Sequence, residues 1–235
     1  FHYIHARGEG RPSARRFVEA ELRRLAAELA TFAGRDLDLD RLRDAIRLHR
    51  EIDRLRAALL DERARLPLGD RELYRLLRRG EYLWPADHLA ELEAAAAGLA
   101  PAPVQRGLPV LVSGIVPEPM SVLDALAAAG AFVAADDYAA IGRRVNRHHP
   151  AALDEPFAAL AELAFAAPPC STRQSNQIAR ADHLESLLEK SGALPRLDHG
   201  GVQRGEHVRE PPQRIGERFA VGHVRAHLAQ NLDQA

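Results

Sequence analysis

Two short apolar runs separated by one helix constrain the fold of this chain more than any other feature. Leu108 to Val112 and Phe132 to Ala135 have the length and the aliphatic composition of buried strands. Between them, Ser121 to Ala129 has helical character and is closed by Gly130. Strand, helix and strand with tight loops favour two parallel strands joined by a right-handed crossover. The segment from Val110 to Arg143 is therefore predicted to be a strand–helix–strand unit.

The chain ahead of this unit, from residue 12 to residue 99, is predicted to be helical. Apolar residues recur there at helical spacing, and the rest is largely Arg and Glu. Pro12 supplies the first helix start, Gly34 ends that helix, and either Asp38 or Asp40 caps the next. Shorter helices are expected over 70–77 and 85–99. No heptad pattern is sustained, so packed hairpins are favoured over a coiled coil.

The chain after the strand–helix–strand unit is predicted to add two helices, over 156–166 and 176–191. A third strand is expected after Gly192, but from Leu194 onward the sequence is rich in Gly, His, Arg, Gln and Pro. Our hypothesis is that a frameshift or a divergent terminus has replaced that strand. The predicted organisation is a loop over 1–11, a helical region over 12–99, a linker over 100–107, a parallel α/β domain over 108–193 and an atypical tail over 194–235.

Charge and cysteine content restrict the classes of function. The formal net charge of -1 supplies no global field for nucleic acid or an anionic membrane. One cysteine allows no disulfide within the chain, which favours a reducing cytoplasm. No apolar run approaches the roughly 20 residues that span a bilayer. The chain starts with Phe1, so we expect it to derive from a larger parent protein.

Polar residues end both predicted strands, at the edge where ligands bind in open parallel sheets. Ser113 and Gly114 end the first strand, where Gly114 permits close backbone approach; the alternative is a plain turn into the next helix. Asp136 and Asp137 end the second, placed to bind a polar ligand, orient a partner or cap a helix. Arg143 opens a basic cluster that also holds Arg144, Arg147, His148 and His149. This cluster suits either a phosphorylated cofactor or a solvated loop.

Two further groups of residues are weaker candidates. Cys170 lacks a histidine partner in local sequence and is predicted to be a packed cysteine rather than a nucleophile or a metal ligand. His223 and His227 share a helical spacing, but zinc would need further ligands. No metal site is predicted. The sequence also lacks a phosphate-binding P-loop, a dinucleotide fingerprint and a nucleophile elbow.

An ordered set of short strings resembles the 2-hydroxyacyl-CoA dehydratase subunits, a family that includes the small subunits of benzoyl-CoA reductases and the D component of 2-hydroxyglutaryl-CoA dehydratase. In the helical region these strings are Arg15–Leu22, Gly34 and Leu42–Ile46. In the later region they are Val112–Ile115, Gly130–Val133, Asp136-Asp137, Gly142-Arg143, Pro168–Arg173 and Arg180–Leu184. The resemblance covers residues 12–193.

The resemblance implies a helical insertion followed by a flavodoxin-like or Rossmann-like parallel α/β domain, incomplete here at both ends. It implies a related partner subunit, a 4Fe–4S cluster and an ATP-dependent activator protein that delivers one electron at low potential. The electron would reach the thioester carbonyl of an acyl-CoA and form a ketyl radical that expels the hydroxyl group. In the reductase branch, electrons enter an aromatic ring instead. The strand-end residues would then lie beside the acyl-CoA or the cluster.

The cysteines depart from the family pattern. Cys170 matches no cluster-ligand position of the family, whose ligands lie before this segment and in the strand expected after Gly192. The family also tends to have Asn where this chain reads His49-Arg50-Glu51. We therefore expect the chain to bind no cluster and to be inactive by itself. The open alternatives are a partial dehydratase subunit, a benzoyl-CoA reductase-type subunit, and a non-catalytic scaffold or remnant that only pairs with a partner.

Overall fold

The first half of the chain is helical, as predicted. A computed structural model describes residues 2–4, 6, 11–105, 107–150, 152–170 and 177–193. Its first elements are α1 (Pro12–Ala33), α2 (Leu39–Asp61), the short η1 (Arg63–Arg65), α3 (Asp70–Arg78), η2 (Arg79–Glu81) and α4 (Pro85–Ala97). Gly34 ends α1 in the left-handed conformation, with φ of 63°. Asp38, rather than Asp40, caps α2, because its side chain accepts from the backbone N–H groups of residues 40 and 41.

The second half contains the predicted strand–helix–strand unit. Its elements are β1 (Leu108–Gly114), α5 (Ser121–Ala128), β2 (Ala131–Tyr138), η3 (Gly142–Arg144), α6 (Pro156–Ala166) and α7 (Gln177–Ser191). The two strands pair in parallel, with a register shift between Val110 and Leu111. Helices are interleaved here with the two strands of a parallel sheet, which confirms the α/β character. Residues 194–235, with the expected third strand and His223 and His227, lie outside the described residues.

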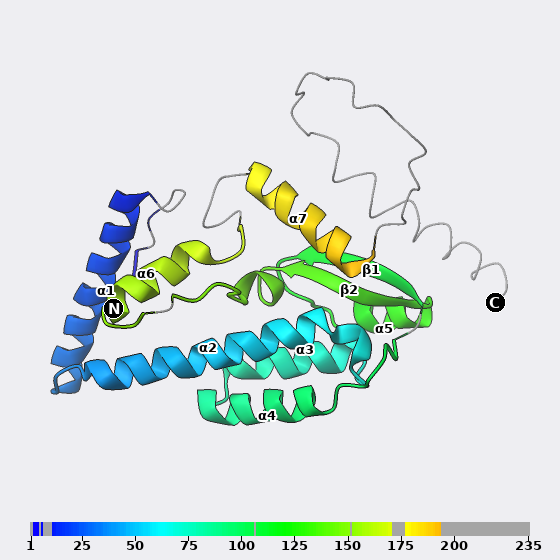
Figure 1. The fold of residues 1–235 in the computed structure, drawn as a ribbon, viewed down its shortest axis with the longest axis horizontal. Coiled ribbons are helices and arrows are strands. Elements are labelled where there is room, and N and C mark those ends of the chain that lie inside the picture. Colours follow the sequence, from blue (N-terminus) through cyan, green and yellow to red (C-terminus); the bar gives the residue numbers. More distant parts are fainter. Residues whose placement is uncertain are drawn as a thin grey trace, which may run out of the picture.

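One apolar core joins the helical region to the sheet. Leu59 of α2, Tyr74 of α3 and Leu92 of α4 belong to the same buried cluster as Leu123 of α5 and Val133 of β2. The helix α4 runs beside α2 on the side away from the sheet (Figure 1). Because burial of apolar side chains is the main stabilising contribution to folding, the helices and the sheet stabilise one another.

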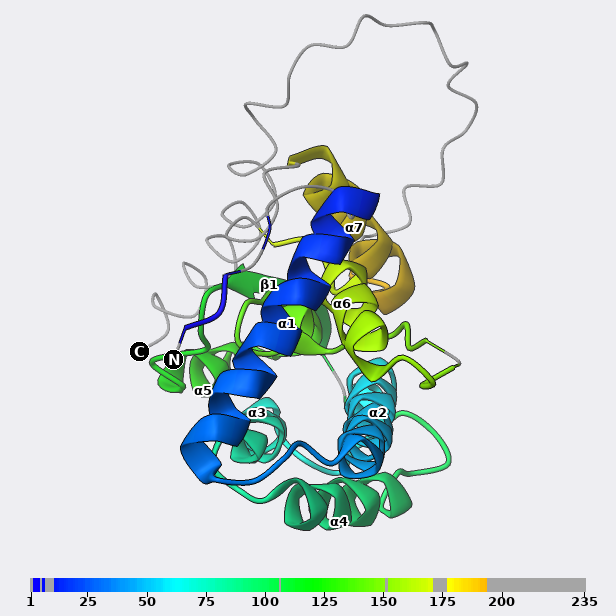
Figure 2. The ribbon, with the colours of Figure 1, turned by 90° about the vertical axis from the view of Figure 1, so that its left-hand side faces the viewer.

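The helix α1 packs against α6, which comes much later in the chain, and Figure 2 shows the two side by side. Its buried residues are Ala14 and Val18. The guanidinium of Arg23 lies 4.7 Å from the ring centre of Phe157 and 3.2 Å from Glu155. The apolar residues of α1 recur at helical spacing, yet Phe17, Leu29 and Phe32 are exposed. The partner of the helix was decided by a segment more than a hundred residues away.

The segment predicted as a linker is fixed to the helical region by hydrogen bonds. The backbone N–H groups of Ala100 and Val104 donate to the carbonyls of Arg65 and Ala64 over 2.9 and 2.8 Å. The side-chain amide of Gln105 donates to the carbonyls of Leu66 and Leu68. Residues 100–105 therefore hold the start of β1 against the turn that follows α2. None of the described helices combines the length and apolar character needed to cross a bilayer.

Candidate functional site at the carboxyl ends of the strands

The site is built around Asp137, whose side chain is fully buried at the end of β2. Ser113 of β1 is its register partner, because the strands are parallel and end at one edge. The hydroxyl Oγ of Ser113 donates to Oδ2 of Asp137 over 2.9 Å. The structure thus brings together two of the residues predicted for this edge.

Two arginines neutralise the buried Asp137 carboxylate. The Nε of Arg143, in η3, lies 3.2 Å from Oδ1 and donates to the Asp137 carbonyl over 2.9 Å. The Nη2 of Arg180, in α7, lies 3.0 Å from Oδ2 and 3.4 Å from Oγ of Ser113. A buried charge needs such partners, since an unpaired carboxylate away from water is very costly.

Arg143 is a buried cross-link rather than an exposed anion receptor. Its Nη2 donates to the carbonyl of Gly114 over 2.5 Å, and its Nη1 lies 3.5 Å from Sγ of Cys170. It therefore ties the ends of both strands to the segment that follows α6. Cys170 is buried beside it, in agreement with the prediction of a packed cysteine.

Three more members of the predicted basic cluster are exposed. Arg144 pairs with Glu81, Arg147 with Asp61 and His148 with Glu162. For these three residues the observed arrangement is the solvated one of the two alternatives raised by the sequence. The fourth, His149, is largely buried, and its side chain is 15% exposed.

Asp136 faces away from Asp137, as alternate side chains of a strand must. Its Oδ1 accepts from the N–H groups of Tyr138 and Gly142 over 3.2 and 3.0 Å, and its Oδ2 accepts from Nη1 of Arg63 over 3.3 Å. Its observed contacts are thus hydrogen bonds and an ion pair within the fold. Gly142 is required here, because a Cβ atom would lie 2.4 Å from the Asp136 carbonyl oxygen.

Gly114 allows a close approach, but the group that approaches is part of the protein. A Cβ atom at this position would lie 2.9 Å from Cε1 of Tyr138. The Gly114 carbonyl accepts from Arg143 and from the N–H of Ala139. The helix α5 begins only at Ser121, so its free N–H groups do not follow directly on the strand end.

One residue of α7, Arg180, completes the site and was not among the residues predicted for it. Arg180 joins the Asp137 cluster, with 30% of its side chain exposed. His183, one turn later, has its pKa lowered by burial, an effect that the negative charge of Asp137 partly offsets. The helix was predicted, but nothing in its sequence indicated that it packs on β2. The string Arg180–Leu184, already part of the family resemblance, was the available signal.

The arrangement suits recognition of a polar ligand better than metal binding. Arg180 presents a partly exposed guanidinium whose position is fixed by a buried carboxylate, which is a geometry suited to carbonyl or phosphate oxygens. In the described part of the chain, no group of three or more His, Cys, Asp or Glu side chains is placed to hold a metal ion. A 4Fe–4S cluster is held by several thiolates, whereas the whole sequence contains one cysteine. The residues of this chain therefore do not fit a cluster.

Comparison with known proteins identifies the family. No curated protein matches the chain. A family model described as 2-hydroxyglutaryl-CoA dehydratase, D-component, matches residues 1–194 of the 235. The match includes both the helical region and the whole site around Asp137. The chain therefore belongs to the 2-hydroxyglutaryl-CoA dehydratase D-component family.

Proposed function

We propose that this chain is part of a subunit of a radical-type 2-hydroxyacyl-CoA dehydratase, which eliminates water from an acyl-CoA thioester. The observation that carries the proposal is the family match over residues 1–194. The resemblance of the ordered strings to dehydratase subunits supports the same reaction class. The proposal includes a cytoplasmic location, a related partner subunit and an ATP-dependent activator protein.

The single cysteine limits what this chain contributes to that reaction. Because its residues do not fit an iron–sulfur cluster, the cluster ligands of the working enzyme belong to protein outside this sequence. We expect the isolated chain to be inactive. Its proposed contribution is binding and positioning of the acyl-CoA.

The proposed contact with the acyl-CoA lies at the edge formed by Ser113, Asp137 and Arg180. Arg180 is the partly exposed member and would donate to a thioester or phosphate oxygen. Asp137 and Arg143 are positioning residues, since both are buried and hold the guanidinium and the strand ends in place. Gly114 and Asp136 would support the same edge indirectly. The carbonyl of Gly114 accepts from Arg143, and the side chain of Asp136 accepts from the N–H of Gly142 in the loop after β2.

A non-catalytic scaffold is the second candidate, and the same cysteine count favours it. Such a subunit would pair with a cluster-bearing partner without contacting the substrate. The two candidates differ in one respect: only the first requires the Asp137 edge to lie in the substrate site. A benzoyl-CoA reductase-type subunit would share that edge and differ in the product.

The test uses the complex of the chain with its related subunit, purified without oxygen and supplied with activator protein, ATP and a 2-hydroxyacyl-CoA. Substitution Arg180→Gln is expected to lower kcat/KM by about tenfold or more, because one charge-assisted contact to the substrate is lost. Arg147→Gln is the matched control, since Arg147 is an exposed arginine paired with Asp61.

Three outcomes separate the candidates. Loss of acyl-CoA dehydration in Arg180→Gln alone, with an intact complex and unchanged melting temperature, supports the substrate role. Full activity of Arg180→Gln supports the scaffold and overturns the proposed contact. Reduction of an aromatic acyl-CoA, with no dehydration of any 2-hydroxyacyl-CoA, assigns the complex to the reductase branch and overturns the dehydratase proposal.

A further inference from the structure

A second polar site lies in a hollow that shares no lining residue with the site around Asp137. The hollow has a volume of about 380 Å³, within the range of small-molecule pockets, roughly 300–1,000 Å³. It is lined by α2, by the segment around Asn146 and His149, and by α6 and the residue that follows it. Its apolar wall includes Leu42, Ile46, Leu160, Leu163, Ala164 and Ala167.

Three buried polar atoms beside this hollow have no hydrogen-bond partner among the described residues. They are Nε of Arg50, Oδ1 of Asn146 and Nδ1 of His149. Buried polar atoms are nearly always hydrogen-bonded, so three such atoms around one hollow indicate a ligand that would satisfy them.

The direction of each missing hydrogen bond follows from the side chain. Arg50 can only donate. The Nε2 of His149 lies 3.1 Å from the backbone carbonyl oxygen of Asn146, which only accepts, so Nε2 is the donor of this pair. In the tautomer with a proton on Nε2 alone, Nδ1 is an acceptor. The Oδ1 of Asn146 is also an acceptor. A matching ligand therefore carries one accepting group beside one group that donates more than once.

The charged side chains of α2 beside the hollow also place a donor next to an acceptor. Arg50 and Asp53 are three residues apart and are neighbours on one helix face. Asp53 lies 4.0 Å from Arg56 and 3.9 Å from His149 and is hydrogen-bonded to the side chain of Asn146, and burial raises its pKa. The guanidinium of Arg50 donates to the backbone carbonyl of Pro150. The hollow thus offers a cationic point next to an anionic one.

We propose that this hollow binds an α-amino acid with an aliphatic side chain. The carboxylate of the amino acid would accept from Arg50. Its ammonium group would donate to Oδ1 of Asn146 and Nδ1 of His149 beside Asp53. The aliphatic side chain would pack on the apolar wall of α2 and α6, where burial contributes roughly 25 cal/mol per Å². This binding is independent of the reaction proposed for the Asp137 edge.

The test is isothermal titration of the full 235-residue chain with L-leucine, D-leucine and 4-methylpentanoate, which lacks the amino group. Saturable binding of L-leucine is expected, with the deaminated acid weaker by about tenfold or more, because the two acceptors and Asp53 then lack a donor. The ligand series uses the unmodified protein, so its result does not depend on any variant folding.

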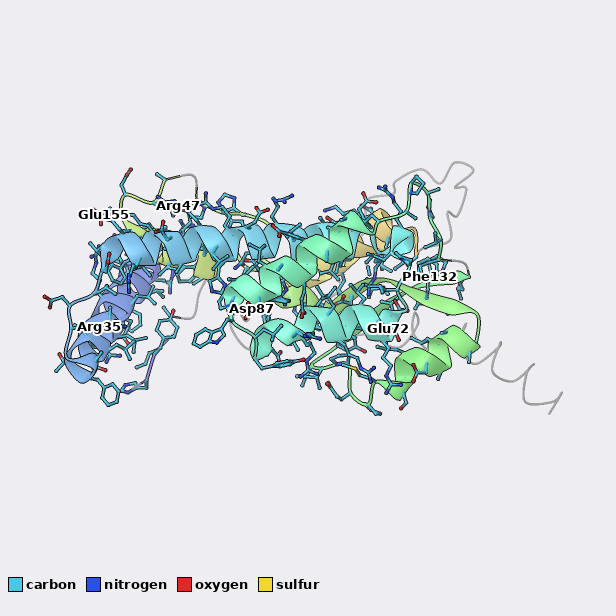
Figure 3. All side chains as sticks on the ribbon, turned by 90° about the horizontal axis from the view of Figure 1, so that it is seen from below. Arg35, Arg47, Glu72, Asp87, Phe132 and Glu155 are labelled. Atoms are coloured by element: carbon cyan, nitrogen blue, oxygen red, sulfur yellow. The ribbon has the colours of Figure 1, made fainter. Side chains whose placement is uncertain are left out.

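Two variants then locate the binding. Arg50→Gln is expected to weaken L-leucine binding by about tenfold or more. Arg47→Gln is the matched control, since Arg47 lies about one turn earlier on α2, is exposed and pairs with Asp44 (Figure 3). No saturable binding of any aliphatic amino acid overturns the proposal. Equal binding of the deaminated acid, or binding unaffected by Arg50→Gln in a protein that melts normally, also overturns it.

Discussion

At the scale of single residues, the side chain of Asp137 is held in place by contacts from three elements. Its carboxylate has no exposed surface and contacts two guanidinium groups and one hydroxyl. The three partners come from β1, η3 and α7. A neutral side chain of the same shape would leave Arg143 buried without its counter-charge.

Substitution Asp137→Asn is therefore expected to lower the free energy of unfolding by about 3–5 kcal/mol, the cost of breaking a buried ion pair. Ser113→Ala, which removes the 2.9 Å hydrogen bond to the same carboxylate and the 3.4 Å contact with Arg180 but leaves the charges in place, is the comparison and is expected to cost about 0.5–1.5 kcal/mol. Urea denaturation followed by circular dichroism measures both. An Asp137→Asn protein as stable as the Ser113→Ala protein would contradict this reading of the site.

At the scale of elements, His88 fixes α4 against α3. The residue is 2% exposed, and its Nε2 lies 3.2 Å from the carbonyl oxygen of Leu76. Gly80 leaves space for the ring, since a Cβ atom there would lie 2.5 Å from Nδ1 of His88. Burial lowers the pKa of His88, and the hydrogen bond to Leu76 only partly opposes this effect.

A histidine whose pKa is lower in the folded state makes the protein less stable in acid. As the pH falls, His88 in the unfolded chain binds a proton first, near pH 6.5. The contribution of neutral His88 to the free energy of unfolding is therefore complete above that pH and decreases as the pH falls toward the pKa of the folded state. His88→Gln is expected to reduce the loss of stability between about pH 7 and pH 5. The pKa of His183 is also lowered, so His183 contributes to the pH dependence of stability with the same sign in the unmodified protein and in the His88→Gln variant. Unfolding free energies of the two proteins with identical pH dependence would exclude this role for His88.

At the scale of the whole molecule, Arg63 joins the helical region to the sheet. It is buried in η1, with Nη1 3.3 Å from Asp136 of β2 and Nη2 3.8 Å from Asp70 of α3. Asp70 in turn accepts from the backbone N–H of Val133 over 2.8 Å. The guanidinium of Arg63 lies 5.3 Å from the ring centre of Tyr74. Helices and strands thus share buried charges as well as an apolar core.

Arg63→Met is expected to destabilise the protein by about 3–5 kcal/mol, because Asp136 stays buried without its cation. The double variant Arg63→Met with Asp136→Asn should lose less than the sum of the two single losses, since the residues are in direct contact. Arg54→Met is the control: Arg54 is exposed and pairs with Glu51, and its loss should cost no more than about 1 kcal/mol. Additive losses in the double variant would show that the ion pair does not couple the two regions.

The sequence by itself determined the order of the helices and strands and several of their ends. Pro12, Gly34 and Asp38 act through local backbone geometry, so the limits of α1 and the start of α2 follow from a few neighbouring residues. The apolar runs at 108–112 and 132–135 likewise determined two parallel strands and the edge where Ser113 and Asp137 meet.

Only the tertiary structure decided which elements pack together and what each polar side chain contacts. The pairing of α1 with α6, and the arrival of Arg180 at Asp137 from α7, depend on contacts between residues far apart in the chain. Periodicity shows that a helix has a face to bury, but not which surface will cover it. The two adjacent aspartates were equivalent in the sequence. The alternation of side chains along β2 directed Asp136 to Arg63 and Asp137 to the candidate site.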